Sequence, residues 1–318
     1  FVGSADVGAT TVSFAGHTAD AVAARLEIES QHVTLSALAL NTLGGTVTAD
    51  GDATWDGPAR GKVRIAWVDL ETGSLFTDPR AAGRTTGRIE LSGGLDDAVG
   101  QGWARWGPDR LDLPPVEARM TLTDGTAHVR LEPWDTAAGV VTARAEIPLK
   151  DLATSEGSGS AVTATLDVDG MSALGAASIA GLAAPEGDVT GRLSAAMQWR
   201  PGDPMPQVQG ALEDAAISSP LGEFAIEEDI TFGFDGEVIR MSDAVVVGEN
   251  ATVIAGGTVD LGAGAVDFAA NLRIAPELGA VLPVPVFIRQ PITVETRLRG
   301  PFDRLEGRRV TPHHVLEG

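Results

Sequence analysis

Histidines and carboxylates are the side chains of this sequence that could hold a metal ion or transfer protons. The five histidines are His17, His32, His128, His313 and His314. Only the last two are adjacent, and neither an HExxH pattern nor a second carboxylate partner accompanies them. We therefore predict no metal site at the histidines.

Asp167, Asp169 and Gly170 match the opening of a calcium-binding loop. The twelfth position counted from Asp167 is Ser178, where an EF-hand loop requires a bidentate Glu. This mismatch favours a hairpin turn at Asp169-Gly170 over a calcium site.

Asp50, Asp52 and Asp56 are spaced closely enough to cluster on one loop. Such a cluster is either a calcium site or a set of solvated turn carboxylates, and we favour the second interpretation.

Nucleophilic and phosphate-binding chemistry has no candidate. The chain has no cysteine, which excludes thiolate nucleophiles and disulfides, and it contains no GxSxG, P-loop or GxGxxG pattern. We predict that the protein is not an enzyme and that it binds no cofactor.

The composition is that of a folded, acidic protein. Apolar residues make up 43% of the 318 residues, and the formal net charge is −21. This charge repels phosphate backbones, so we predict no nucleic-acid partner. No apolar run reaches the length of about 18 residues that a membrane-spanning helix needs. Because the chain starts at Phe1, we expect any signal or anchor segment to lie upstream.

The elements that would have to position a functional site are β-strands. In residues 116–122 the odd and even positions separate completely, with Val116 and Met120 on one face and Glu117 and Arg119 on the other. The same alternation occurs in residues 62–67, 141–147, 162–168, 266–272 and 292–299. Each of these segments is predicted to be a strand with one apolar and one polar face.

Several Asp-Gly pairs predict tight hairpin turns, since glycine supplies the positive φ that such turns need. The pairs are Asp50-Gly51, Asp56-Gly57, Asp124-Gly125, Asp169-Gly170 and Asp235-Gly236. Residues 171–184 are the only segment of helix-like composition, and we interpret them as a short helix or a loop. The six tryptophans, Trp55, Trp67, Trp103, Trp106, Trp134 and Trp199, lie mostly near expected turns or strand ends, where large rings cover the edges of a core.

The predicted fold class is therefore all-β: an elongated, mostly antiparallel, curled sheet, similar to a groove-like solenoid, with an apolar interior and few short helices. A long sheet must cover its apolar face, either with protein or with something else. The candidate lining residues for a lipid groove are Val63, Ile65, Val116, Met120, Leu122, Val141, Ile147, Val162, Leu166, Val168, Val266, Phe268, Leu272, Ile292, Val294 and Leu298. A smooth lining of this kind suits acyl chains better than a polar metabolite.

Residues 207–217, 232–241, 255–261 and 266–268 form an ordered pattern: an opening strand, a short hairpin around Asp235-Gly236, a Gly-Thr-Val-Asp-Leu strand and a Val-Asp-Phe strand. A Pro-rich bend at 282–286, a last strand from 291 and a Gly/Pro exit at 298–301 follow. This pattern resembles the C-terminal region of the AsmA-like superfamily. Residues 30–150 are similar to the strand-and-glycine repeats of TamB, YhdP and YdbH, its larger members.

The resemblance implies a periplasmic β-groove (often called a β-taco), anchored to the inner membrane, that moves phospholipid between the membranes or contributes to outer-membrane assembly. Its expected partners are phospholipid or another acyl lipid, and an outer-membrane protein. Two features depart from the family: its N-terminal transmembrane helix is absent from this sequence, and Gly300-Pro301 stands where Asp-Pro or Asn-Pro is more common.

The predicted organisation has four parts: a repeat-like groove segment at 1–153, a connecting segment at 154–204, an AsmA-like β region at 205–302 and a tail at 303–318. A competing interpretation is a sealed β-solenoid, such as an adhesin or autotransporter passenger, or another structural envelope protein. The presence or absence of an unfilled apolar channel separates the two.

Overall fold

Antiparallel β-strands make up most of the computed structural model. The structure describes residues 2–14, 17–74, 82–94, 97–109, 113–149, 160–180, 187–200, 203, 205–219, 222–249, 251–274, 292–301 and 306–309. The chain divides into two units, of which unit 1 comprises Phe1–Thr136 and Thr142–Ala164 and unit 2 comprises Ala137–Val141 and Thr165–Gly318. Strands β11 and β12, in the predicted connecting segment, contribute to unit 2.

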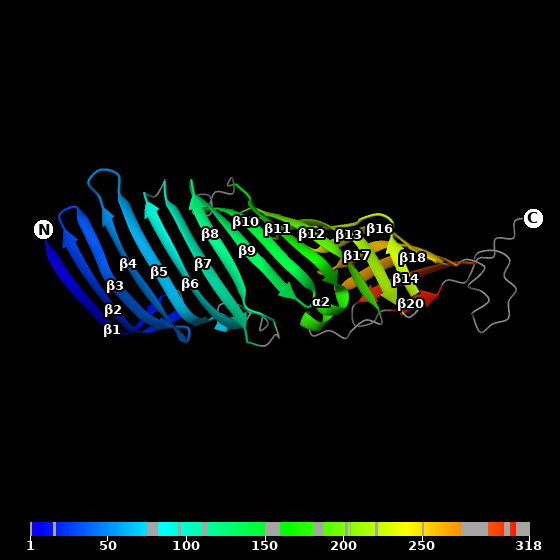
Figure 1. Ribbon diagram of the computed structural model, residues 1–318, viewed down its shortest axis with the longest axis horizontal. Helices are drawn as coiled ribbons and strands as arrows, with labels where there is room; N and C mark the ends of the chain where they lie inside the picture. The colour runs from blue at the N-terminus through cyan, green and yellow to red at the C-terminus, as the bar shows by residue number, and fades with distance from the viewer. Residues whose placement is uncertain are drawn as a thin grey trace, which may run out of the picture. The chain divides into compact units, whose positions relative to one another are not determined.

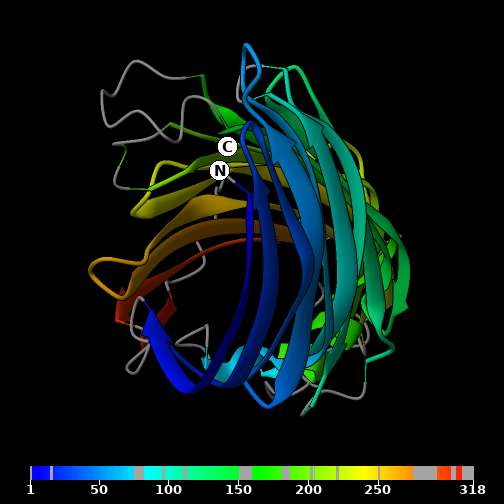
Figure 2. The ribbon, with the colours of Figure 1, turned by 90° about the vertical axis from the view of Figure 1, so that its left-hand side faces the viewer.

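Unit 1 is a meander in which each strand pairs antiparallel with the next. Its strands are β1 (Gly3–Phe14), β2 (His17–Glu29), β3 (His32–Thr42), β4 (Gly45–Thr54), β5 (Arg60–Glu71), β6 (Gly83–Gly93), β7 (Val99–Pro108), β8 (Val116–Thr123), β9 (Thr126–Thr136) and most of β10 (Gly139–Pro148), with a short 3-10 helix η1 (Thr72–Ser74) after β5. Figure 1 shows β1–β8 side by side in chain order. Figure 2 shows that these strands bow in one direction, so the sheet of unit 1 has a concave and a convex face.

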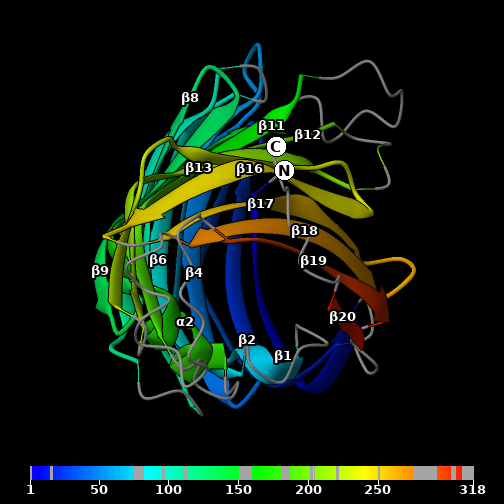
Figure 3. The same cartoon turned by 90° about the vertical axis from the view of Figure 1, so that its right-hand side faces the viewer.

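Unit 2 has the same antiparallel construction. It contains most of β11 (Val162–Ser172), helix α2 (Ala173–Ala180), β12 (Asp188–Trp199), β13 (Gln207–Ser219), β14 (Gly222–Ile226), β15 (Ile230–Phe234), β16 (Val238–Gly248), β17 (Ala251–Asp260), β18 (Ala265–Ile274), β19 (Ile292–Pro301) and β20 (Glu306–Arg309). Strands β14 and β15 both pair with β13 on one side and with β16 on the other, so they act as one interrupted strand. Figure 3 shows the curvature of β13 and β16–β19.

The predicted fold class is confirmed: the described chain is all-β, with twenty strands in one long antiparallel sheet. Every segment predicted as a strand from its alternation is a strand. Helix α2 occupies part of the segment that we interpreted as a helix or loop. Its first turn is capped from β12, because the Asp188 carboxylate accepts hydrogen bonds from the Leu174 N–H at 3.0 Å and the Ser172 hydroxyl at 2.9 Å.

Three of the five Asp-Gly pairs form turns, namely those at Asp56, Asp124 and Asp235. The turns predicted at Asp50-Gly51 and Asp169-Gly170 are wrong, because these pairs lie inside β4 and β11. Gly51 is needed for another reason: a Cβ atom there would lie 2.4 Å from the Lys62 carbonyl oxygen of the adjacent strand.

Leu43-Gly44 provides a hairpin turn without an Asp-Gly signal. Both residues have positive φ, 49° and 70°, and they join Thr42 to its partner Gly45 as a two-residue turn.

Candidate functional site

The apolar residues of unit 1 line up across neighbouring strands on one face of the sheet. Ile65 of β5 pairs with Ile89 of β6, which pairs with Gly102 of β7, and that row continues through Met120 of β8 to Val129 of β9. Because alternate residues of a strand point to opposite faces, each row places its side chains on the same face. We call this surface of β4–β9 the unit 1 apolar face.

The unit 1 apolar face lies on the concave side of the bowed sheet. Its residues in β4–β9 are all buried or half-buried, whereas the alternate positions include exposed residues such as Thr48, Gln101 and Arg130. Side chains inside a bend crowd together and those outside it splay apart, which accounts for this difference. The apolar side chains therefore face the inside of the curve.

Within unit 1, the described strands form a single sheet in which neighbours pair side by side. Among the described residues of unit 1, the extensive contacts of each strand are with its ladder neighbours, and η1 touches β6. Seven hydrophobic side chains are buried in the described part of both units, and none of their side chains is less than 2% exposed. A chain with 43% apolar residues normally builds a deeper core than this.

Glycines on the unit 1 apolar face allow large rings to lie flat. A Cβ atom on Gly87 would be 2.3 Å from Cζ2 of Trp67, and one on Gly83 would be 2.6 Å from Nε1 of Trp106. Each ring thus covers a backbone that has no side chain. The Trp67 indole donates a hydrogen bond to the Thr85 hydroxyl at 3.3 Å, which satisfies its polar atom without leaving the apolar face.

Unit 2 has an apolar face built in the same way. Gly210 pairs with Phe232, which pairs with Met241, and the row continues through Gly257 to Phe268. Phe232 lies over Gly210 and Phe268 over Gly257, where added Cβ atoms would approach ring carbons to 2.2 and 3.0 Å. A small buried cluster of Ile230, Ala244 and Val246 extends this face, with partly buried neighbours packed against it.

The predicted lining residues divide between the two units. Unit 1 contains Val63, Ile65, Val116, Met120, Leu122, Ile147 and Val162, and unit 2 contains Val141, Leu166, Val168, Val266, Phe268, Leu272, Ile292, Val294 and Leu298. The pairing registers place the first five of unit 1 on one face, and likewise Val266, Phe268 and Leu272 in unit 2. Leu122 and Val168 are buried, and the other lining residues with described side chains are half-buried. The side chains of Ile292, Val294 and Leu298 lie outside the described residues.

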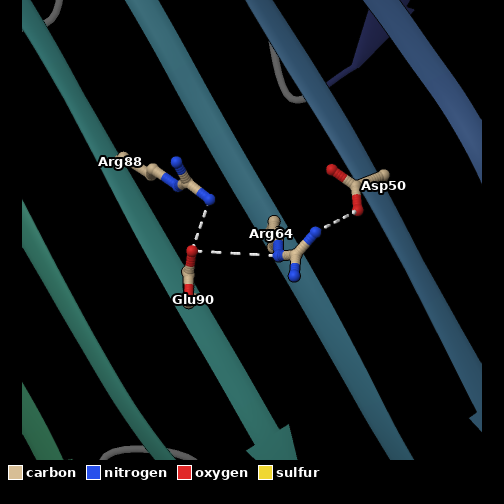
Figure 4. Close-up of polar contacts among 4 residues, drawn as sticks. All are labelled: Asp50, Arg64, Arg88 and Glu90. Atoms are coloured by element: carbon tan, nitrogen blue, oxygen red, sulfur yellow. Dashed lines mark hydrogen bonds and ion pairs between the residues drawn. The ribbon is translucent and has the colours of Figure 1, made fainter.

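The opposite face of unit 1 carries ion pairs that cross the strands. Arg64 of β5 lies between Asp50 and Glu90, with N···O distances of 3.6 and 3.8 Å, and Arg88 also pairs with Glu90 (Figure 4). All four side chains are at least partly exposed, so each pair contributes little to stability. These cross-strand ion pairs are more informative as evidence that this face of the sheet is exposed to solvent. They also show that Asp50 is a strand residue with an arginine partner, so the predicted loop cluster of aspartates is wrong.

Unit 2 has a stronger ion pair on its polar face. Arg297 of β19 donates two hydrogen bonds to the Asp267 carboxylate of β18, at 2.6 and 2.7 Å. This bidentate pair lowers the pKa of Asp267 below its usual range, and the charge of Arg299 adds to the effect.

Trp103 is an exception to the expectation that the tryptophans lie mostly near turns or strand ends. It lies within β7 rather than at a strand end, and it faces the polar side of the sheet with 41% of its surface exposed. It pairs with Arg88 of β6 and with Arg119 of β8. The alternation along β7 predicts this orientation, because Gln101, Trp103 and Arg105 are alternate residues and therefore lie on the same face of the strand.

The histidines and acidic residues that could bind a metal ion do not gather into a site in the part of the chain that the structure describes. The His32 ring hydrogen-bonds the Thr34 hydroxyl at 2.8 Å, and His128 lies 3.5 Å from Glu146. Within the described ranges, no group of three histidine or acidic residues has a geometry suited to a metal ion. His313 and His314 lie outside the described residues.

Comparisons of the chain with models of protein families, with curated proteins and with solved structures found no significant match. Among the helices that the structure describes, none is long and apolar enough to cross a bilayer.

Proposed function

We propose that this protein binds acyl lipid along the apolar faces of its two units and acts as a lipid-carrying groove protein of the cell envelope. The observation that carries the proposal is the unit 1 apolar face. This face is continuous over at least six strands, and the described contacts of these strands within unit 1 are with their ladder neighbours and η1. An apolar surface of this extent in water requires a partner.

Acyl chains match the chemistry of these faces. Burial of each methylene contributes about 0.8 kcal/mol, so a chain of many methylenes gains several kcal/mol without any directional contact. The rows through Met120 and Phe268 present aliphatic, thioether and aromatic groups and no charged side chain. Such a lining holds a lipid weakly at each point, which permits movement along it.

Within this proposal, the protein is an AsmA-like protein of the periplasm that transfers phospholipid between the inner and outer membranes or supports outer-membrane assembly. The order of elements in residues 205–302 supports this assignment. Strand β13, the β15–β16 hairpin at Asp235-Gly236, and strands β17 and β18 follow the order on which the resemblance rests. The closing Pro-rich bend at 282–286 lies outside the described residues. The protein acts in this role without catalysis, together with an outer-membrane partner.

Site-specific photo-crosslinking in cells tests the proposal. A benzophenone amino acid at Met120 or Phe268 is expected to capture phospholipid, detected by mass spectrometry of the adduct. The matched controls are Thr121 and Ala269, which are the next residues in the same strands and are exposed on the opposite faces. Equal capture at all four positions, or capture of protein alone at Met120 and Phe268, would contradict lipid binding and favour a sealed structural solenoid.

A further inference from the structure

The convex face of unit 1 has a hollow that the proposed lipid function does not use. Its volume is about 960 Å³, and it lies over β6, β7 and β8 on the polar side of the sheet. We call its central residues, Arg88, Trp103, Arg105 and Arg119, the Trp103 patch. Four arginines and three carboxylates line the hollow, whereas the whole chain has 23 basic and 44 acidic residues. Among the residues that line the hollow, arginines therefore outnumber carboxylates by one.

The arginines of this surface differ in how far they are neutralised. Arg88 pairs with Glu90, and Arg119 pairs with Glu132 at 3.1 Å. The guanidinium of Arg105 has no ion pair or hydrogen bond with any residue that the structure describes. Arg130, which pairs with Arg119 in the β8–β9 ladder, is likewise without a described side-chain partner. The guanidinium of Arg105 in the hollow therefore remains available to an external anion, and so does that of Arg130, which does not line the hollow.

Trp103 adds an apolar contact at the centre of these charges. Its ring lies between Arg88 and Arg119 on the adjacent strands and is 41% exposed. Tryptophan and arginine are the residues most enriched at the energetic centres of protein interfaces, because they combine a large buried area with strong hydrogen bonds. A tryptophan amid charged side chains has no role in the core of this sheet.

We propose that the Trp103 patch binds a carboxylate-rich segment of a partner protein. A guanidinium pairs with a carboxylate through two parallel hydrogen bonds, and Arg105 is free to do so. The hollow is open rather than enclosed, which suits a peptide segment lying across the strands. The net charge of −21 does not prevent binding, because charges more than about 8 Å away are largely screened at physiological salt.

Binding of a labelled oligoglutamate peptide to the intact chain tests this proposal, measured by fluorescence anisotropy at physiological salt. Arg105→Glu is expected to weaken binding by about tenfold or more, since it places a like charge against the peptide. Arg144→Glu is the matched control, because Arg144 is an exposed strand residue of unit 1 without a described partner, and the change in net charge is identical. It should alter the affinity by less than about twofold.

A second variant separates the role of the ring from that of the charges. Trp103→Ala is expected to weaken binding, whereas Trp103→Phe should retain most of it, and neither should change the circular dichroism of this exposed position. The proposal is overturned if the peptide does not bind, or if Arg105→Glu and Arg144→Glu behave alike. It is also overturned if phosphatidylglycerol vesicles bind through Arg105 and the peptide does not, since the patch would then recognise a membrane surface. Lipid capture at Met120 is independent of all these outcomes.

Discussion

Phe268→Asp places a carboxylate on the apolar face of unit 2 and tests whether that face is open. Phe268 is half-buried over Gly257, in the row that includes Met241. Full burial of a phenylalanine side chain stabilises a fold by about 1.5–3 kcal/mol, so its removal from a half-buried site should cost about 1–2 kcal/mol. On an open face the new carboxylate reaches water and adds little to that cost.

In a sealed core the same substitution would be far more damaging. An unpaired buried charge adds several kcal/mol, which brings the total above about 4 kcal/mol and close to the whole stability of a marginal domain. The loss of stability expected on an open face and the loss expected in a sealed core therefore differ by more than the uncertainty of a thermal melt. For a unit of this size the open face predicts a fall in Tm of about 2–8 °C.

Circular dichroism melting and lipid co-purification measure the two consequences. The variant should retain its β signal at physiological temperature while losing bound phospholipid, because one carboxylate and its water interrupt the path of many methylenes. Ala269→Asp introduces the same charge on the exposed side of the same strand and should affect neither measurement. Cooperative loss of the β signal at physiological temperature in the Phe268 variant alone would refute the open face.

Two further predictions concern packing and pH. Gly87→Ala should lower the free energy of unfolding by about 1–3 kcal/mol, because the new Cβ atom would lie 2.3 Å from the Trp67 ring. Gly8→Ala is the control and should not lower it, because no atom lies within 4 Å of a Cβ atom at that position. Thermal melting of both variants checks this. Asp267→Asn should destabilise the protein at neutral pH, because the pKa of Asp267 is lowered by Arg297 in the folded state. The contribution of a carboxylate with a lowered pKa is present above its unfolded pKa of about 3.9 and is lost as pH falls through the folded value. Urea unfolding should therefore show a difference from the wild type that is clear at neutral pH and shrinks below about pH 4, and a difference independent of pH would contradict the ion-pair explanation.

Strand positions could be predicted from local pattern because the two faces of each strand are chemically distinct. Val116 and Met120 alternate with Glu117 and Arg119, and a strand is the only regular structure that places such alternate residues on opposite faces. The predicted lining residues that share a register on one face follow from the same rule.

Turns were less predictable because an Asp-Gly pair serves more than one purpose. Asp50-Gly51 has the composition of a hairpin turn, but in β4 the aspartate pairs with Arg64 and the glycine admits a close approach of the Lys62 carbonyl. Both roles depend on the neighbouring strand, which local sequence does not reveal. Leu43-Gly44 shows the converse, since a turn forms there without an aspartate.

The sequence by itself determined that this protein is a sheet of antiparallel strands with one apolar face, because alternation and short connections are local properties. Only the tertiary structure decided which strands adjoin and which glycines lie beneath rings. It also decided that Trp103 has two arginines beside it, one on each neighbouring strand. These features depend on register and curvature, which arise from pairing between residues far apart along the chain. Strand pairing in the sheet consequently brings the residues of each candidate site together, whereas the face on which each residue lies can be predicted from the alternation along its own strand.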